Sequence, residues 1–190
     1  MARYILDMTK PDQQSFIELV NNDNAATIGE PLTLEGVNLV NERPVLEAEG
    51  IARQFAVTIE NKAYVKDKVE VYFNKVKLED VVEMSAEKGD FDWYDPDTWE
   101  DATSPAQAVT AFKAAAVRAG VGADVVLHDL VATREYDNEL NRYYLVIATK
   151  SMVFHTGAKF QMPKHFSETV SVTELNGFIY EPIKPEDVVA

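Results

Sequence analysis

Residues 53–73 read RQFAVTIENKAYVKDKVEVYF, with an apolar side chain at every second position on both sides of a charged turn at residues 66–68. A period of two residues sends alternate side chains to opposite faces of a strand, so this stretch predicts two antiparallel strands. Residues 142–164, RYYLVIATKSMVFHTGAKFQMPK, repeat the pattern around a turn at residues 155–157. Matching residues stand 89 positions apart: Arg53 and Arg142, Phe55 and Tyr144, Lys75 and Lys164.

A helix is expected ahead of each pair of strands. Thr9, with Asp12 three residues later, is a helix-start signal, and apolar residues then recur at helical spacing as far as residue 22. Ser104 is followed by Pro105, which favours the first position of a helix, and this second helix should end near residue 119. The residues expected on the buried faces are Phe16, Val20, Val109 and Phe112.

These elements predict an α+β protein of two similar small subdomains, each with one helix and about three antiparallel strands. The remaining strand of each subdomain is expected at residues 37–45 and 125–133, and a further one at 168–173. The expected boundaries are 1–82 for the first subdomain, 83–103 for a linker, 104–175 for the second subdomain and 176–190 for an extended tail containing Pro182 and Pro185. True duplication is one explanation of the likeness, and a coincidence between two ordinary α+β halves is the other.

The composition excludes several classes of protein. The 190 residues include no cysteine, which excludes disulfide scaffolds, thiolate metal sites and cysteine nucleophiles. The net charge is −14, whereas direct binding to nucleic acid normally requires a basic surface. No apolar run approaches the ~18 residues of a membrane-spanning helix. The first residues lack the apolar region of a secretory signal, so we expect a soluble protein made in the cytoplasm.

The acidic charge is concentrated between residues 79 and 101. This segment has ten acids and a single base, Lys88, and therefore carries −9 of the net charge of −14. It also contains both tryptophans, and aromatic anchors flanked by acids are typical of a peptide that docks on a basic partner. The alternative is a solvated connector whose aromatic side chains fold back on one subdomain. We predict contact with another subunit through Phe91, Asp92, Trp93, Tyr94, Asp95, Asp97 and Trp99.

No motif in the sequence points to catalysis. Residues 90–97 suggest calcium binding but fail the EF-hand pattern, because Tyr94 takes the third ligand position and Asp95 replaces the turn glycine. An irregular cation site in this segment remains an alternative. A glycine-rich phosphate loop and a nucleophile elbow are both absent. The histidines lack the spacing of a helical zinc site: His128, His155 and His165. We therefore expect a protein that is not an enzyme, with no catalytic residue, cofactor or bound metal.

Four segments carry a resemblance to a known family: FIELVNNDN at 16–24, LTL at 32–34, VTI at 57–59 and KVEVYFNKVKL at 68–78. The first half, about residues 12–81, resembles a small domain of virion structural proteins in large tailed bacteriophages. Residues 104–165 match loosely, because Arg118-Ala-Gly stands where the family has an Asn-Asp-Asn ending. The resemblance implies a non-enzymatic building block of the particle, and it transfers no catalytic residue.

We therefore expect a structural component of a tailed-bacteriophage virion, in its tail, neck, baseplate or head surface. Its expected partners are other virion proteins or copies of itself, with no nucleic acid and no membrane. One alternative is an acidic regulatory or inhibitor protein that mimics nucleic acid. Such a mimic would spread carboxylates over a whole face, whereas here the excess lies in one segment. The other alternative is a small hydrolase with a pair of catalytic carboxylates.

Overall fold

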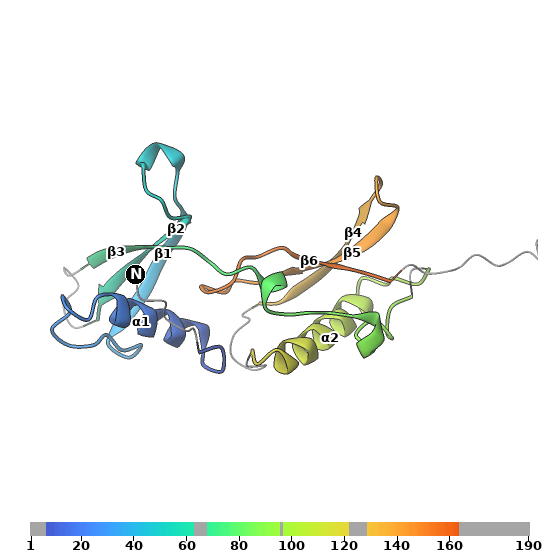
Figure 1. The fold of residues 1–190 in the computed structure, drawn as a ribbon, viewed down its shortest axis with the longest axis horizontal. Helices are drawn as coiled ribbons and strands as arrows, with labels where there is room; N and C mark the ends of the chain where they lie inside the picture. Colours follow the sequence, from blue (N-terminus) through green and yellow to red (C-terminus); the bar gives the residue numbers. More distant parts are fainter. Residues whose placement is uncertain (1–6, 63–67, 96, 122–128, 164–190) are drawn as a thin grey trace, which may run out of the picture.

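Two units of the same layout make up the computed structural model, which describes residues 7–62, 68–95, 97–121 and 129–163 (Figure 1). The first contains α1 (Asp12–Asp23), β1 (Val37–Pro44), β2 (Phe55–Asn61) and β3 (Lys68–Phe73). The second contains α2 (Ser104–Arg118), β4 (Val131–Asp137), β5 (Arg142–Ala148) and β6 (Ala158–Gln161). Each sheet is an antiparallel meander, in the orders β1-β2-β3 and β4-β5-β6. The predicted fold class is confirmed.

In the first subdomain α1 covers one face of its sheet. Phe16 and Val20, one helical turn apart, are buried against Val57 and Ile59 of β2. The Phe16 ring meets the ring of Phe73 edge to face, with centroids 4.8 Å apart. The predicted burial of Phe16 and Val20 is therefore confirmed.

In the second subdomain α2 packs on the face of β5 that carries Leu145 and Ile147, both fully buried. Phe112 is also fully buried, as predicted, whereas Val109 is only partly buried. The offset of 89 pairs Phe55 with Tyr144, which lies on the opposite face from Leu145. The buried faces of β2 and β5 correspond instead at an offset of 88, because a shift of one residue moves every side chain of a strand to its other face. Opposite them, Val71 of β3 and Phe160 of β6 keep the offset of 89.

Thr9 and Ser104, the hydroxyl residues that begin the two helix-start signals, do not cap their helices. The Thr9 hydroxyl donates to Asp7 Oδ1 at 2.6 Å, and the residue that caps α1 is Pro11, with no side-chain hydrogen bond. Ser104 is already the first residue of α2, and its Oγ accepts from the backbone N–H of Glu100 at 3.2 Å. The Ser15 hydroxyl of α1 donates to the Asp7 carbonyl at 2.9 Å, so the chain before each helix contacts the first turn of that helix.

At the junction, each subdomain contributes a side chain to the core of the other. Leu78, which follows β3, is fully buried in the second core, and Met152, which precedes β6, is buried in the first. Val76 forms a parallel bridge with Phe154, and Asp12 Oδ2 accepts from the backbone N–H of Met152 at 3.0 Å. The boundary expected at residue 82 is therefore too late, since packing assigns Leu78 to the second subdomain.

Several expectations fall on residues outside the described ranges. These are the turn at 66–67, residues 125–128 of the strand expected at 125–133, the strand at 168–173 and the tail at 176–190. The described part corrects the third strand of the second subdomain, because β4 begins at Val131 and continues to Asp137. Within the described residues, neither helix has the length and hydropathy needed to cross a membrane.

Candidate docking surfaces

The aromatic side chains of residues 83–103 lie on this chain's own second subdomain. Phe91 is buried in its core, with 4% of its surface exposed. Trp93, Tyr94 and Trp99 are half-buried against the same core, and their ring centroids are 5.9–6.4 Å apart. The expectation that another subunit covers these rings is therefore corrected. Apolar area of this size is removed from water by the nearest apolar surface, which here belongs to the same chain.

A buried carboxylate anchors this segment. Asp90 is 4% exposed, and Nη2 of Arg118 on α2 lies 2.6 and 2.7 Å from its two carboxylate oxygens. The backbone N–H of Ser85 donates to the same carboxylate at 3.0 Å, and Trp93 Nε1 donates to the Asp90 carbonyl at 2.7 Å. These contacts tie the aromatic cluster to the end of α2.

Arg134 of β4 joins the aromatic cluster to the sheet. Its guanidinium carbon lies 4.2 Å from the ring centroid of Tyr143 and 5.3 Å from that of Trp99, which is cation–π geometry. Burial raises the pKa of the Tyr94 hydroxyl, and a hydrogen bond with Arg134 partly opposes this change. The cluster is thus a packed structural unit.

Apart from Asp90, the acidic side chains of residues 83–103 face solvent, unlike the aromatic side chains of the same segment. Asp92, Asp95 and Asp97 are exposed, so they form an acidic surface over the buried rings. That these acids select a basic partner surface stays a prediction. The described residues contain no group of three or more histidine, aspartate or glutamate side chains placed to hold a metal ion.

His155 lies at the junction of the subdomains, with its ring 5.5 Å from that of Phe55. The other two histidines, His128 and His165, lie outside the described residues.

An apolar groove between α1 and β3 was not predicted from the sequence. It consists of two hollows of about 340 and 320 Å³, and Val20 and Val71 line both. β3 is an edge strand whose Val69 is 62% exposed, while Val71 and Phe73 are only half-buried. The helix is short, with a polar ending at residues 21–24, and this was the one sequence signal that part of the sheet would stay uncovered.

The corresponding edge of the second sheet is covered. Glu79 Oε1 accepts from the backbone N–H of Lys159 on β6 at 3.1 Å, and Leu78 and Val82 beside it are fully buried. Among the described residues no segment covers the edge of β3 in this way. The two subdomains therefore differ most at their third strands.

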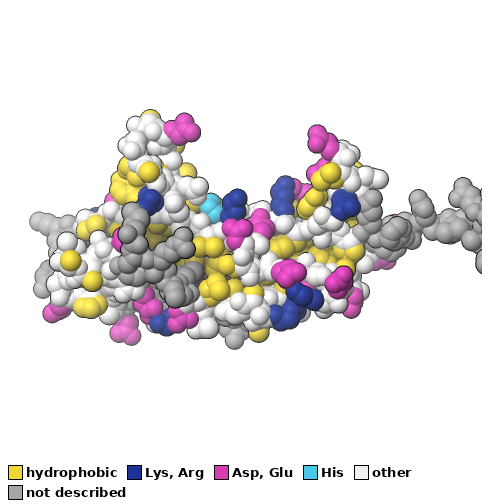
Figure 2. Space-filling view, viewed as in Figure 1, with side chains coloured by type: hydrophobic (Ala, Val, Ile, Leu, Met, Phe, Trp, Pro, Cys, Tyr) yellow, Lys and Arg dark blue, Asp and Glu magenta, His cyan; other side chains and the backbone are white. Residues whose placement is uncertain are grey.

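Two hairpins rise from the same side of the molecule (Figure 1). Leu46, 64% exposed, lies in the loop between β1 and β2, and Leu140, 56% exposed, lies in the turn between β4 and β5. Acidic side chains lie near the ends of both hairpins, close to apolar ones (Figure 2). Each hairpin thus presents an apolar residue among acids.

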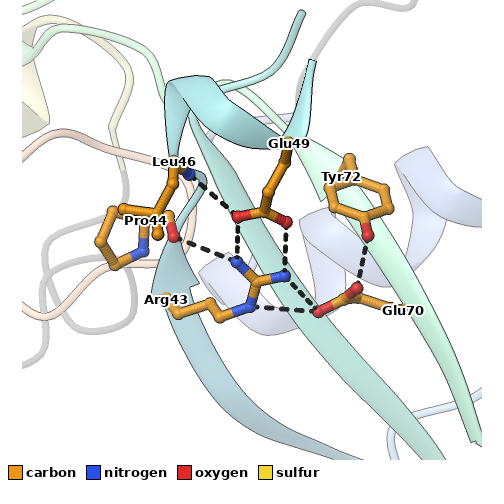
Figure 3. A network of polar contacts seen from close by, with 6 residues as sticks. All are labelled: Arg43, Pro44, Leu46, Glu49, Glu70 and Tyr72. Atoms are coloured by element: carbon orange, nitrogen blue, oxygen red, sulfur yellow. Dashed lines mark hydrogen bonds and ion pairs between the residues drawn. The ribbon is translucent and has the colours of Figure 1, made fainter. Parts of the chain in front are cut away.

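The first hairpin is held by the network in Figure 3. Arg43 of β1 donates to Glu49 at 2.8 and 3.0 Å and to Glu70 of β3 at 2.9 and 3.2 Å. Arg43 and a hydrogen bond from the Leu46 backbone lower the pKa of Glu49 to about 2. The Tyr72 hydroxyl and Arg43 together hold the pKa of Glu70 below its usual value. The loop is thus fixed to the sheet by charge-assisted hydrogen bonds.

Comparisons with known family models, curated proteins and solved structures found no match to this chain.

Proposed function

We propose that this protein is a non-enzymatic structural component of a tailed-bacteriophage virion, made in the host cytoplasm and acting through contacts with other virion proteins or copies of itself. The observation that carries the proposal is the apolar groove beside edge strand β3, whose outer side no described segment covers. The assignment to a virion rests on the resemblance of residues 12–81.

An uncovered edge supports an assembly role because its unpaired backbone groups are a template for a strand from another chain. Two of the other three edges are less suited to pairing: β1 has an irregular register next to Asn41, whose φ is +56°, and β6 is covered by the segment around Glu79. Exposed Val69 and half-buried Val71 offer apolar contacts where a partner strand would lie.

The exposed acids support a basic partner surface. Asp92, Asp95 and Asp97 lie outside the aromatic cluster, and acids flank Leu46 and Leu140 on the hairpins. Exposed charges of this kind select partners and raise association rates more than they add affinity.

Mass spectrometry of purified particles tests the proposal. We expect the chain at a constant copy number per particle, retained after high-salt washing, with a non-structural phage protein as the negative control. Absence from particles, together with tight one-to-one binding to a nucleic-acid-binding protein, would favour the acidic mimic instead.

A further inference from the structure

The segment that follows β3 has a counterpart after β6. Lys75-x-x-x-Glu79-x-Val81 and Lys164-x-x-x-Glu168-x-Val170 have the same spacing, 89 residues apart. The first of these segments is described by the structure, and its contacts indicate what the second could do.

The first segment attaches β3 to the neighbouring subdomain. Lys75 Nζ donates to the Ser151 carbonyl at 2.6 Å, and Val76 bridges Phe154 just before β6. Glu79 accepts from the outward N–H of Lys159 on the edge of β6. This segment therefore joins one subdomain to the third strand of the next.

The edge of β3 offers an equivalent surface. Val71 of β3 lies opposite Val57 in its sheet, and Phe160 of β6 lies opposite Leu145 in the other sheet. Val71 and Phe160 are therefore equivalent positions. The residues just before them, Glu70 and Lys159, are equivalent as well. The groove beside β3 is apolar. It lies where Leu78 and Val82 would lie by analogy with the second subdomain.

The direction of the chain selects a second copy as the partner. The chain leaves β6 at the end of the molecule remote from the first sheet (Figure 1). Lys164 follows Pro163 directly, so it starts from that remote end. The next subdomain in the repeating arrangement is therefore the first subdomain of another molecule.

We propose that residues 164–172 of one copy dock in the groove between α1 and β3 of the next, an inference that rests on the proposed assembly role. The Glu168 carboxylate accepts a hydrogen bond from the backbone N–H of Glu70. The side chains of Phe166 and Val170 fill the hollows beside Val71. Leu78 and Val82 align with Ser167 and Ser171, so Phe166 and Val170, each one residue earlier, supply the apolar contacts in their place. The contact is heterologous and joins the copies head to tail, in a ring or a filament.

Cysteine cross-linking tests the contact directly, because the chain has no cysteine of its own. Full-length Val69→Cys is mixed with full-length Thr169→Cys and treated with a short bis-maleimide. We expect a cross-linked dimer of the two variants. The matched control replaces Val69→Cys by Val131→Cys, at an edge position of similar exposure on β4, and should give no dimer. Equal yields with both partners would overturn the proposal.

Sedimentation velocity gives a second measurement. We expect self-association that grows with concentration, at least about tenfold weaker in Glu168→Lys and after removal of residues 164–190, but unchanged after removal of 176–190. The melting temperature of dilute Glu168→Lys should equal that of the parent chain. A lower one, or a link within one molecule of a Val69→Cys/Thr169→Cys double variant, would place the segment in its own groove and overturn the proposal.

The N-terminal residues are the remaining occupant to test. Two results together would show that residues 1–6 fill the groove. Their removal would lower stability, and the Val69–Thr169 link would form only after that removal. The proposal would then be wrong. Cross-linking inside purified particles separates the two proposals. A chain present in particles without the link refutes the docking contact alone, and a link formed by a chain absent from particles refutes the virion role alone.

Discussion

At the scale of single residues, a few charged groups hold segments that are far apart in the sequence. Asp90 lies almost without exposure at the end of α2, and Asp12 lies between the subdomains with 1% exposure. A buried carboxylate is stable only where cations or N–H groups face it, so each of these residues specifies its neighbours.

Arg118→Met should destabilise the protein by about 1–3 kcal/mol, because it leaves the Asp90 carboxylate buried without its cation. Arg118 is half-exposed, so the loss of unfolding free energy should be at the lower end of the range measured for fully buried ion pairs. Urea unfolding measures it. The control is Lys150→Met, which breaks an exposed pair with Asp129 and should cost less than about 1 kcal/mol. Equal losses in both variants would contradict the role of Asp90.

At the scale of elements, residues 83–103 and the β1–β2 loop are short irregular segments held by side chains. The first is fixed by aromatic packing and the second by Arg43. Alternation predicted β2, β3, β5 and β6 correctly because the direction of a side chain along a strand is a local property. It did not predict that the aromatic segment folds back, since that depends on which distant surface lies nearby.

Trp93→Ala/Trp99→Ala should lower the stability of the isolated protein by about 2–5 kcal/mol, because both rings pack on its own core. The matched variant Asp92→Asn/Asp95→Asn/Asp97→Asn removes exposed charge from the same segment and should leave the melting temperature nearly unchanged. Thermal unfolding of the two variants compares them. Stable protein lacking both tryptophans would restore the original interpretation, in which another subunit binds them.

The β1–β2 loop should lose its anchor at acidic pH. The pKa of Glu49 is about 2 in the folded protein and 4.5 ordinarily, so its ionised form favours the anchored loop above about pH 4.5. That preference is lost as the pH falls from about 4.5 towards 2. The protection factor of the Leu46 amide, whose N–H donates to Glu49, should fall over this range once the exchange rate is corrected for its intrinsic pH dependence. Arg43→Gln should shift this loss of protection to higher pH, and a protection factor that does not change with pH in either protein would refute the anchor.

At the scale of the whole molecule, two small cores are joined by reciprocal insertions. Leu78 and Met152 each complete the core of the other subdomain, and Asp12 bonds the backbone of Met152 across the junction. Small cores gain stability from such shared surfaces, so the subdomains should unfold together.

Asp12→Ala should uncouple the two subdomains. Both tryptophans pack on the second core, so their fluorescence follows that subdomain, whereas far-ultraviolet circular dichroism follows both. The two signals should coincide in the parent chain and separate in Asp12→Ala, with a loss of about 1–3 kcal/mol for the first subdomain. Asp12→Asn keeps an acceptor oxygen and should behave more like the parent. Coincident transitions in Asp12→Ala would show that other contacts couple the subdomains.

Local pattern alone determined the α+β class, the two helices and five of the six strands, because periods of 3.6 and 2 residues are properties of short stretches. It placed β4 too early, since the strand expected at 125–133 overlaps the observed one, Val131–Asp137, at only three residues. It also determined which helix positions are buried at Phe16, Val20 and Phe112. Tertiary structure decided where Trp93 and Trp99 lie, which subdomain Leu78 completes and why β3 is left beside an apolar groove. These outcomes depend on the shapes of surfaces that meet only in the folded chain, where apolar area is buried against whatever lies within reach.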